Sequence, residues 1–188
     1  MRAAVCDNRR MPPIHLLAIS GSLRAKSSNG SLLLAARALA PEGVEVVLYG
    51  GLGDLPLFNP DLDDEPGPPT VVSFREQLRA ADGVIVSSPE YAHGVPGAMK
   101  NALDWVVGSG ELVDKPVALW NASPTSTYAH AALTEILTVM SARWLPEASI
   151  ELPLRRGMTA EEIAADPEFA PTIRAALAAF AALAEFES

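Results

Sequence analysis

Five short apolar segments recur along the chain, and longer segments with helical periodicity separate them. The apolar segments cover residues 14–20, 44–50, 83–88, 116–123 and 148–154. Most are almost continuously hydrophobic, which is typical of strands buried on both faces of a parallel sheet. Between them, apolar side chains recur three and four residues apart, as at Met99, Leu103 and Val106, and this spacing gives a helix one apolar face. The pattern therefore predicts strands and helices in regular alternation.

Alternating strands and helices with short connections form open parallel sheets with right-handed crossovers. Five strands favour the flavodoxin-like order 2-1-3-4-5, a three-layer doubly wound α/β fold, over the six-stranded dinucleotide-binding order. We predict a single domain over residues 13–188 and a flexible tail over residues 1–12, with Met1 and Met11 as alternative starts of translation. Segment 54–69 is too long for an ordinary loop, and we expect either a functional wall or a mobile lid there.

Composition narrows the range of partners. A formal net charge of −9 gives the 188-residue chain no overall positive field, which makes nucleic acid and membrane surfaces poor partners. No apolar run reaches the roughly 18 residues of a membrane span, and residues 1–13 lack the apolar centre of a signal peptide. We therefore expect a cytoplasmic protein. The single cysteine, Cys6, excludes an internal disulfide, and no histidine pair has the spacing of a metal site.

The segment after the first predicted strand has the composition of a phosphate site. It reads SGSLRAKSSNG over residues 20–30 and leads into a helix. Helix N-terminal amides, the hydroxyls of Ser22, Ser27 and Ser28, and the charge of Arg24 are suitable donors to a phosphate. In the alternative, residues 27–29 only cap the helix and Arg24 is solvated. Neither the P-loop pattern nor GxGxxG is present, which disfavours a nucleoside triphosphate or a nicotinamide dinucleotide in a Rossmann cleft.

The segment after the third predicted strand fits the opposite wall of the same crevice. It reads PEYAHGVPG over residues 89–97, and Gly94 and Gly97 allow backbone to approach a flat ligand closely. Pro96 suits the first turn of the next helix. In the alternative, Glu90 is a solvated loop carboxylate and Tyr91 a packed rim aromatic. In an open α/β sheet, ligands bind beyond the carboxyl ends of the strands where strand order reverses, and both segments are placed there.

Taken together, GSLRAKSSN at 21–29 and PEYAHGVPGAMKNALDW at 89–105 resemble the NAD(P)H-dependent FMN reductase family, which includes flavin-dependent quinone and azo-dye reductases. The resemblance in element order covers residues 14–186. It implies bound FMN, NAD(P)H as co-substrate and a small acceptor such as a quinone, an azo compound, free flavin or a metal oxyanion. The cofactor-binding residues it implies are Ser22, Arg24, Ser27, Ser28, Asn29, Pro89, Glu90, Tyr91, Ala92, His93, Gly94 and Ser123.

Two departures from the family pattern stand out. Many members carry a polar residue, often Asn, where this chain has Ala92, so one contact to the flavin is expected to be missing. After the fourth strand this chain reads ASPTSTYAHAAL at 122–133, where the family often has a glycine-rich turn. The resemblance therefore supports a flavin contact at Ser123 less strongly than at the other positions. No catalytic side chain is expected, because a flavin carries most of the reactivity itself.

Two further questions stay open at the level of sequence. The alternative to an enzyme is a flavodoxin-like electron carrier or redox-responsive flavin-binding protein without turnover. The family resemblance also implies a homodimer or homotetramer. Trp105, Tyr128 and Trp144 are amphipathic side chains of the kind enriched at interfaces, although they could equally complete the core of one subunit.

Overall fold

The computed structural model describes residues 12–64 and 66–185, which form a parallel sheet with helices on both faces. The strands are β1 (Ile14–Ser20), β2 (Val44–Tyr49), β3 (Gly83–Ser87), β4 (Pro116–Asn121), β5 (Arg143–Trp144) and β6 (Ile150–Glu151). The helices are α1 (Ser28–Leu39), α2 (Pro69–Ala80), α3 (Gly97–Asp104), α4 (Thr127–Val139), α5 (Ala160–Ala165) and α6 (Phe169–Glu185). The predicted tail up to residue 11, with Cys6 and both candidate starts, lies outside the described residues.

The strand order is β2-β1-β3-β4-β5 with every pair parallel, which confirms the predicted flavodoxin-like topology. Strand β1 lies in the middle, with Ile14 opposite Val44 of β2 and Leu16 opposite Gly83 of β3. The connection after β1 leads to one side of the sheet, and the connection after β3 leads to the other. A crevice therefore opens beyond the carboxyl ends of β1 and β3.

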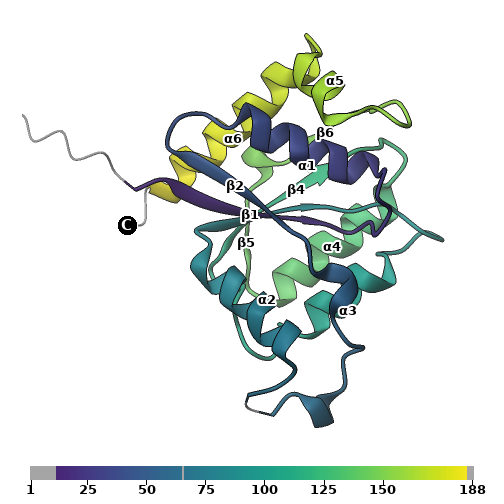
Figure 1. The fold of residues 1–188 in the computed structure, drawn as a ribbon, viewed down its shortest axis with the longest axis vertical. Helices are drawn as coiled ribbons and strands as arrows, with labels where there is room; N and C mark the ends of the chain where they lie inside the picture. Colours follow the sequence, from purple (N-terminus) through teal and green to yellow (C-terminus); the bar gives the residue numbers. More distant parts are fainter. Residues whose placement is uncertain (1–11, 65, 186–188) are drawn as a thin grey trace, which may run out of the picture.

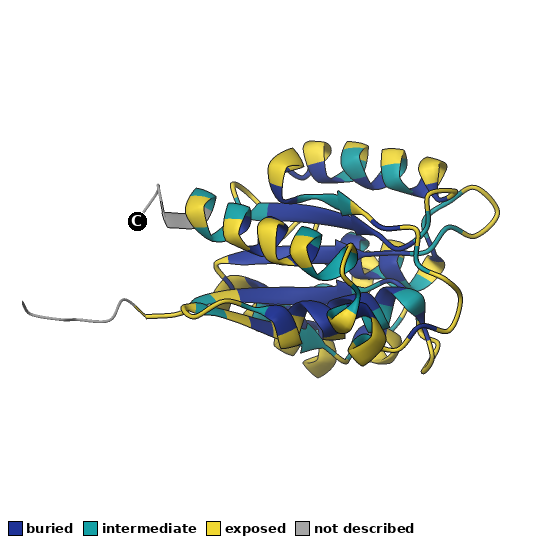
Figure 2. Ribbon diagram, turned by 90° about the horizontal axis from the view of Figure 1, so that it is seen from above, coloured by how far each residue is buried: buried dark blue, intermediate teal, exposed yellow. Residues whose placement is uncertain are grey.

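Three layers make up the molecule (Figure 1). Helices α1, α5 and α6 cover one face of the sheet and α2, α3 and α4 cover the other, with one apolar cluster on each side. Figure 2 shows buried strands between helices whose outer faces are exposed. All five residues of β3 are buried, which accounts for its unbroken apolar sequence. This two-sided core fixes the strand ends from which the loops of the site extend.

The predicted fifth strand, 148–154, is wrong in its extent, because two short strands, β5 and β6, share this edge and both pair with β4. The N–H of Leu145 donates to β4, but Pro146 has no N–H with which to continue the ladder. The chain bends there through a short 3-10 helix. The Ser149 hydroxyl then accepts from the N–H of Leu119 at 3.0 Å before pairing resumes at β6.

Helix α5 is missing from the sequence prediction, although its start carries a readable signal. The Thr159 side chain accepts from the N–H of Glu162 at 3.2 Å, and the Glu162 carboxylate accepts from the N–H of Thr159 at 2.8 Å. This reciprocal pair is a capping box, and its pattern is T-x-x-E. The box fixes the point at which the chain turns after β6 and packs α5 against α1.

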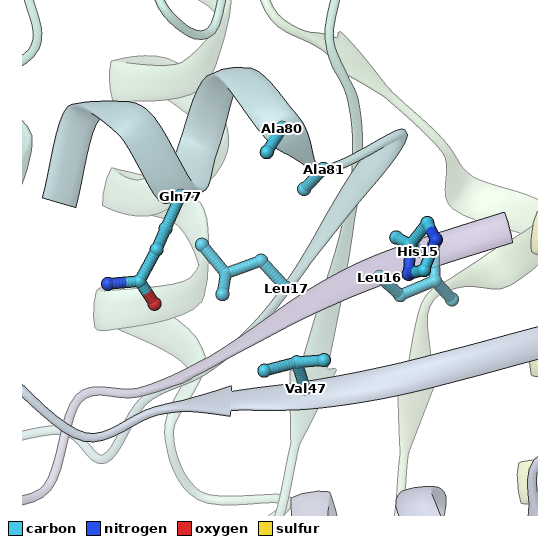
Figure 3. Close-up of a pocket in the computed structure, with 7 residues that line it drawn as sticks. All are labelled: His15, Leu16, Leu17, Val47, Gln77, Ala80 and Ala81. Carbon is cyan, nitrogen blue, oxygen red and sulfur yellow. The ribbon is translucent and has the colours of Figure 1, made fainter. Parts of the chain in front are cut away.

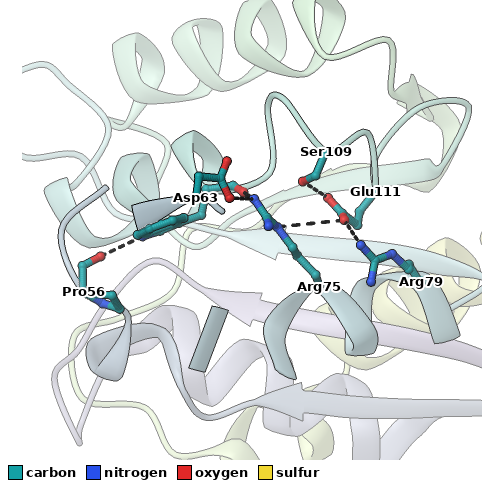
Figure 4. A network of polar contacts seen from close by, with 7 residues as sticks. Pro56, Asp63, Arg75, Arg79, Ser109 and Glu111 are labelled. Atoms are coloured by element: carbon teal, nitrogen blue, oxygen red, sulfur yellow. Dashed lines mark hydrogen bonds and ion pairs between the residues drawn. The ribbon is translucent and has the colours of Figure 1, made fainter. Parts of the chain in front are cut away.

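The first half of segment 54–69 is hydrogen-bonded to α3 and the residue after it. The side-chain amide of Asn101 donates to the Pro56 carbonyl at 2.9 Å and accepts from the N–H of Phe58 at 2.8 Å. The indole N–H of Trp105 donates to the same Pro56 carbonyl at 2.7 Å (Figure 4). Since α3 follows the 89–97 segment directly, these contacts favour the wall alternative over the mobile one.

The second half of that segment is tied to a buried carboxylate network (Figure 4). Arg75 pairs with Asp63 at 2.8 Å and lies 4.0 Å from the fully buried carboxylate of Glu111. Arg79 and the Ser109 hydroxyl both donate to Glu111. A buried carboxylate is tolerated only when it is paired and hydrogen-bonded. The network therefore ties the segment to α2 and to the turn that follows α3.

Candidate functional site

A cavity of about 340 Å³ lies beyond the carboxyl ends of β1, β3 and β4. Its walls come from the loops that follow these three strands and from the segment between β6 and α5. The lining residues are Ser22, Arg24, Ser27, Ser28, Asn29, Pro89, Glu90, Tyr91, Ala122, Ser123, Thr125, Ser126, Leu154 and Arg156. The parallel sheet brings these segments together because all of its strands end at the same edge.

The loop after β1 approaches β3 very closely at Gly21. Its N–H donates to the Ser87 carbonyl at 2.8 Å. A Cβ at Gly21 would lie 2.3 Å from the Ser88 hydroxyl oxygen and 3.1 Å from the Ser88 Cα, so any side chain there would force the loop or Ser88 to move. Deeper in, the Ser87 hydroxyl donates to the side-chain oxygen of Asn29 at 2.9 Å, in a buried contact between β3 and α1. These contacts set the position of the α1 N-terminus beside the third strand.

The N-terminus of α1 faces the cavity with donors and without acids. Its cap, Ser27, accepts through its hydroxyl from the N–H of Gly30, and the first turn contains no acidic residue. A helix leaves the N–H groups of its first turn without partners inside the helix, and they carry the positive end of the helix dipole. With Ser22, Ser28 and Arg24 around them, these groups can bind an anion such as a phosphate.

The segment after β3 makes a tight turn over residues 91–94. The backbones of Tyr91 and Gly94 hydrogen-bond to each other in both directions, at 3.0 and 3.1 Å. Ala92 and His93 between them adopt left-handed backbone conformations, with φ of 50° and 57°. Such conformations cost most L-residues roughly 1–2 kcal/mol, and Asn tolerates them better than Ala does. The Asn common in the family at position 92 thus suits the turn itself, whatever contact it makes to a ligand.

Two contacts fix this turn to the start of α4. The Glu90 carboxylate accepts from the N–H of Ala129 in the first turn of α4 at 2.9 Å. The His93 ring stacks on the Tyr128 ring, with centroids 4.2 Å apart and planes 20° apart. Ser126, the N-cap residue of α4, makes no side-chain cap of its own. Glu90 therefore supplies the missing cap and joins two walls of the cavity.

Nine of the twelve predicted cofactor-binding residues line this one cavity, while Ala92, His93 and Gly94 do not. Those three form the turn at its rim. Leu154 and Arg156 line the cavity without having been predicted. They follow the last strand, and their only signal in the sequence is their position just after a strand end. The motif that identified the other loops is absent there.

A second cavity, of about 300 Å³, lies between α2 and strands β1 and β2, away from these loops (Figure 3). Its lining is mostly apolar, with Leu17, Val47 and Ala80 prominent. The one imidazole there, His15, lies 3.1 Å from the Glu45 carboxylate. This groove has no convergent donors for a charged ligand.

Over residues 12–64 and 66–185, no group of three or more His, Cys, Asp or Glu side chains is arranged to hold a metal ion. Within the same ranges, no helix combines the length and the apolar character needed to cross a bilayer.

The fold is that of a flavodoxin-like α/β protein, with a cavity that contains anion-suited donors at the switch point of its sheet. Residues 14–153 match the model of the NADPH-dependent FMN reductase family, and the chain belongs to that family. The match ends just before Leu154 and Arg156.

Named relatives agree with this assignment. The chain is 40% identical over 106 residues to the quinone reductase of Escherichia coli K12, which covers 56% of this chain and 55% of that protein. It is 35% identical over 145 residues to the NADH:(hydroxy)cinnamate reductase subunit CrdA of Vibrio ruber, covering 74% and 71%. The matched part thus spans about half the length of the Escherichia coli protein.

Among solved structures, the flavoenzyme NAD(P)H:(acceptor) oxidoreductase FerB from Paracoccus denitrificans superposes with a TM-score of 0.74 at 27% identity, covering 92% of this chain and 98% of that one. A WrbA-like flavodoxin from Agrobacterium tumefaciens, at 14% identity and a TM-score of 0.57, shares the fold.

The residues present fit FMN. The cavity combines an acid-free helix N-terminus and three serine hydroxyls for a phosphate with a second wall at residues 89–91 for a flat ring. Arg24 has no side-chain hydrogen bond or ion pair among the described residues, so its guanidinium is available to a phosphate.

Proposed function

We propose that this protein is an FMN-dependent NAD(P)H oxidoreductase of the cytoplasm that reduces a small acceptor such as a quinone. One observation carries the proposal: a single cavity joins the open N-terminus of α1 to the loop after β3. Family membership supports the same cofactor and the same electron donor.

In this proposal each wall of the cavity has one task. The α1 amides, Ser22, Ser27, Ser28 and Arg24 hold the phosphate of the cofactor, while backbone at 89–91 faces its ring. Ser123, from the loop after β4, lies on the third wall. Glu90 acts through the protein, because its carboxylate caps α4 and keeps two walls in register.

Bound FMN supplies the redox chemistry, since it can take two electrons from a nicotinamide and release them to an acceptor. Overall, NAD(P)H and one proton reduce a quinone to a hydroquinone and leave NAD(P)⁺. The side chains of this chain bind and orient the reactants, which explains why the cavity contains no pair of a nucleophile and a base. The exposed Tyr91 side chain at the rim is placed to contact an aromatic acceptor.

The test is a spectrum and an assay on the purified full-length chain. We expect a yellow protein, or one that binds added FMN, which oxidises NAD(P)H in the presence of a quinone. A colourless protein that does not bind FMN would contradict the proposal. Stopped-flow mixing of the flavin-loaded protein with NAD(P)H alone then separates an enzyme from an electron carrier. Fast flavin reduction supports the enzyme, and absence of reduction supports the carrier.

Association into a homodimer or homotetramer is part of the same proposal. Tyr128 is 57% exposed and Trp144 is 37% exposed, so both are available at a subunit interface. Trp105, the third candidate, is fully buried and completes the core of the subunit instead. Sedimentation of the wild type and a Tyr128→Ala variant tests the assembly, and a wild type that remains monomeric at micromolar concentration would contradict it.

A further inference from the structure

Arg156 brings a second guanidinium to the candidate cofactor cavity. It lies in the segment between β6 and α5, which Figure 1 shows at the same end of the molecule as the start of α1. Arg156 and Leu154 line the cavity together with Ser27, Ser28 and Asn29 of the α1 start. The match to the family model ends at residue 153, so the family assignment gives no role to Arg156.

Six of the eleven basic side chains in the described part of the chain have acceptors, among them Arg143, which donates to the Leu183 carbonyl. Arg75, Arg79 and Lys100 pair with carboxylates. Lys115 and Arg174 donate to backbone carbonyls. Lys26, Arg37 and Arg155 have no acceptor within that part, but they do not line the cavity.

Arg24 and Arg156 differ from these residues. Within the described ranges neither guanidinium has a hydrogen-bond or ion-pair partner, and both line the same cavity. The one carboxylate that lines it, on Glu90, accepts from the start of α4. A cavity with two uncommitted guanidiniums in a chain of net charge −9 is suited to an anion that comes from outside.

Guanidinium geometry narrows the class of anion. Its planar fork of N–H donors matches the oxygens of a phosphate, and a monoester offers three such oxygens and close to two negative charges. We propose that Arg156 binds a phosphate monoester of a nucleotide held in this cavity. The inference rests on the proposed function, which supplies two nucleotides of this chemistry. One is FMN with its 5′-phosphate, and the other is NADPH with its 2′-phosphate.

Four ligands separate the two sources, because riboflavin lacks the phosphate of FMN and NAD⁺ lacks the 2′-phosphate of NADP⁺. The full chain is freed of flavin by dialysis and titrated with FMN and with riboflavin, following flavin fluorescence. The flavin-loaded protein is then titrated with NADP⁺ and NAD⁺. Arg156→Gln is compared with Arg155→Gln, which removes the same charge from the exposed neighbour that does not line the cavity.

We expect Arg156→Gln to weaken one phosphorylated ligand about tenfold and to leave its unphosphorylated partner unchanged. A selective loss of FMN affinity assigns Arg156 to the flavin phosphate, and a selective loss of NADP⁺ affinity assigns it to the nicotinamide nucleotide. Arg155→Gln should change neither the affinity of FMN relative to riboflavin nor that of NADP⁺ relative to NAD⁺.

Three results would overturn the inference. The affinity of FMN relative to riboflavin and that of NADP⁺ relative to NAD⁺ could both stay unchanged in Arg156→Gln. A phosphorylated ligand and its unphosphorylated partner could weaken equally, or Arg155→Gln could act as strongly as Arg156→Gln. Binding of FMN by the wild type with any of these results would leave the proposed function intact. A wild type that binds no FMN would instead remove the proposed function first.

Discussion

Two helix N-termini border the same cavity, and they differ in whether a carboxylate of the protein binds their free N–H groups. The start of α4 is closed by a carboxylate, because Glu90 accepts from the N–H of Ala129. The start of α1 has no acid in its first turn and is surrounded by hydroxyls and Arg24. Both helix ends carry the same partial positive charge. The protein caps one of them with a charged carboxylate and the other only with the neutral Ser27 hydroxyl, so the difference indicates where an anion can bind.

Helix α5 extends the comparison. Its first turn contains Glu161 and Glu162, and Glu162 closes a capping box with Thr159. Like α4, this helix satisfies its N-terminus with a carboxylate from the protein. Helices α2 and α3 also begin without an acidic residue or a side-chain cap, but no residue of either helix lines the cavity.

The largest expected effect comes from the glycine that holds the α1 end against β3. Gly21→Ala places a Cβ 2.3 Å from the Ser88 hydroxyl oxygen, and relief requires backbone movement. We expect a loss of about 1–3 kcal/mol in the free energy of unfolding, measured with urea, together with weaker FMN binding. The control is Gly30→Ala within α1, where the new Cβ meets nothing closer than 3.7 Å. Equal stability of the two variants would show that the β1–α1 loop is free to move away.

The second prediction tests the open helix end itself. Arg24→Ala should weaken FMN binding by about tenfold or more, because hydrogen bonds to charged groups contribute roughly 1.5–3 kcal/mol. Riboflavin binding should hardly change. Arg37→Ala, at the far end of α1, is the matched control for lost charge. Fluorescence titration of the wild type and both variants gives their dissociation constants for FMN and riboflavin, and an unchanged FMN constant in Arg24→Ala would remove Arg24 from the site.

The third prediction tests the closed helix end. Glu90→Ala removes the α4 cap and should cost about 1 kcal/mol of unfolding free energy, as loss of an N-cap usually does. Glu90→Gln keeps an acceptor oxygen and should cost less. Ser126→Ala should be nearly neutral, since that residue provides no side-chain cap. If Ser126→Ala costs as much as Glu90→Ala in urea denaturation, Glu90 is not the cap.

The smallest effect is a pH dependence at α5. Hydrogen bonds from its own backbone N–H and from Thr159 lower the pKa of Glu161 below its usual value of 4.5. The unfolded chain then binds this proton more readily, so the stabilisation is present above that pH and is lost as the pH falls through the lower folded pKa. Glu161→Gln should flatten the fall in stability below about pH 4.5. The unfolding free energies of wild type and variant are measured with urea at a series of pH values down to pH 3. An equal fall in both proteins would contradict this prediction.

The sheet was largely predictable because buried parallel strands are nearly continuous apolar runs. Strands β1 to β4 begin at the residues where those runs begin. The fifth strand failed at Pro146, whose missing N–H interrupts the ladder in a way that hydrophobicity does not reveal. Helix α5 was missed because six residues are too few for a periodic pattern, although its capping box was readable.

The cavity also contains segments that the sequence predicted and one that it did not. Loops 22–29 and 89–91 were predictable, since each follows a strand at the switch point and carries a recognisable composition. Arg156 was not, because its place depends on how the chain folds back over α1 after β6. Ala92 was predicted as a missing flavin contact, whereas its φ of 50° adds a conformational reason for the family's Asn there.

The interrupted edge of the sheet has a consequence for how copies of this protein meet. Strands β5 and β6 are two residues long each and are separated by a turn that contains a proline. An edge of this kind offers no run of free N–H and C=O groups for a strand of another molecule, which protects against edge-to-edge aggregation. At this edge, contact between copies therefore depends on side-chain surfaces, which single substitutions can weaken without unfolding the chain.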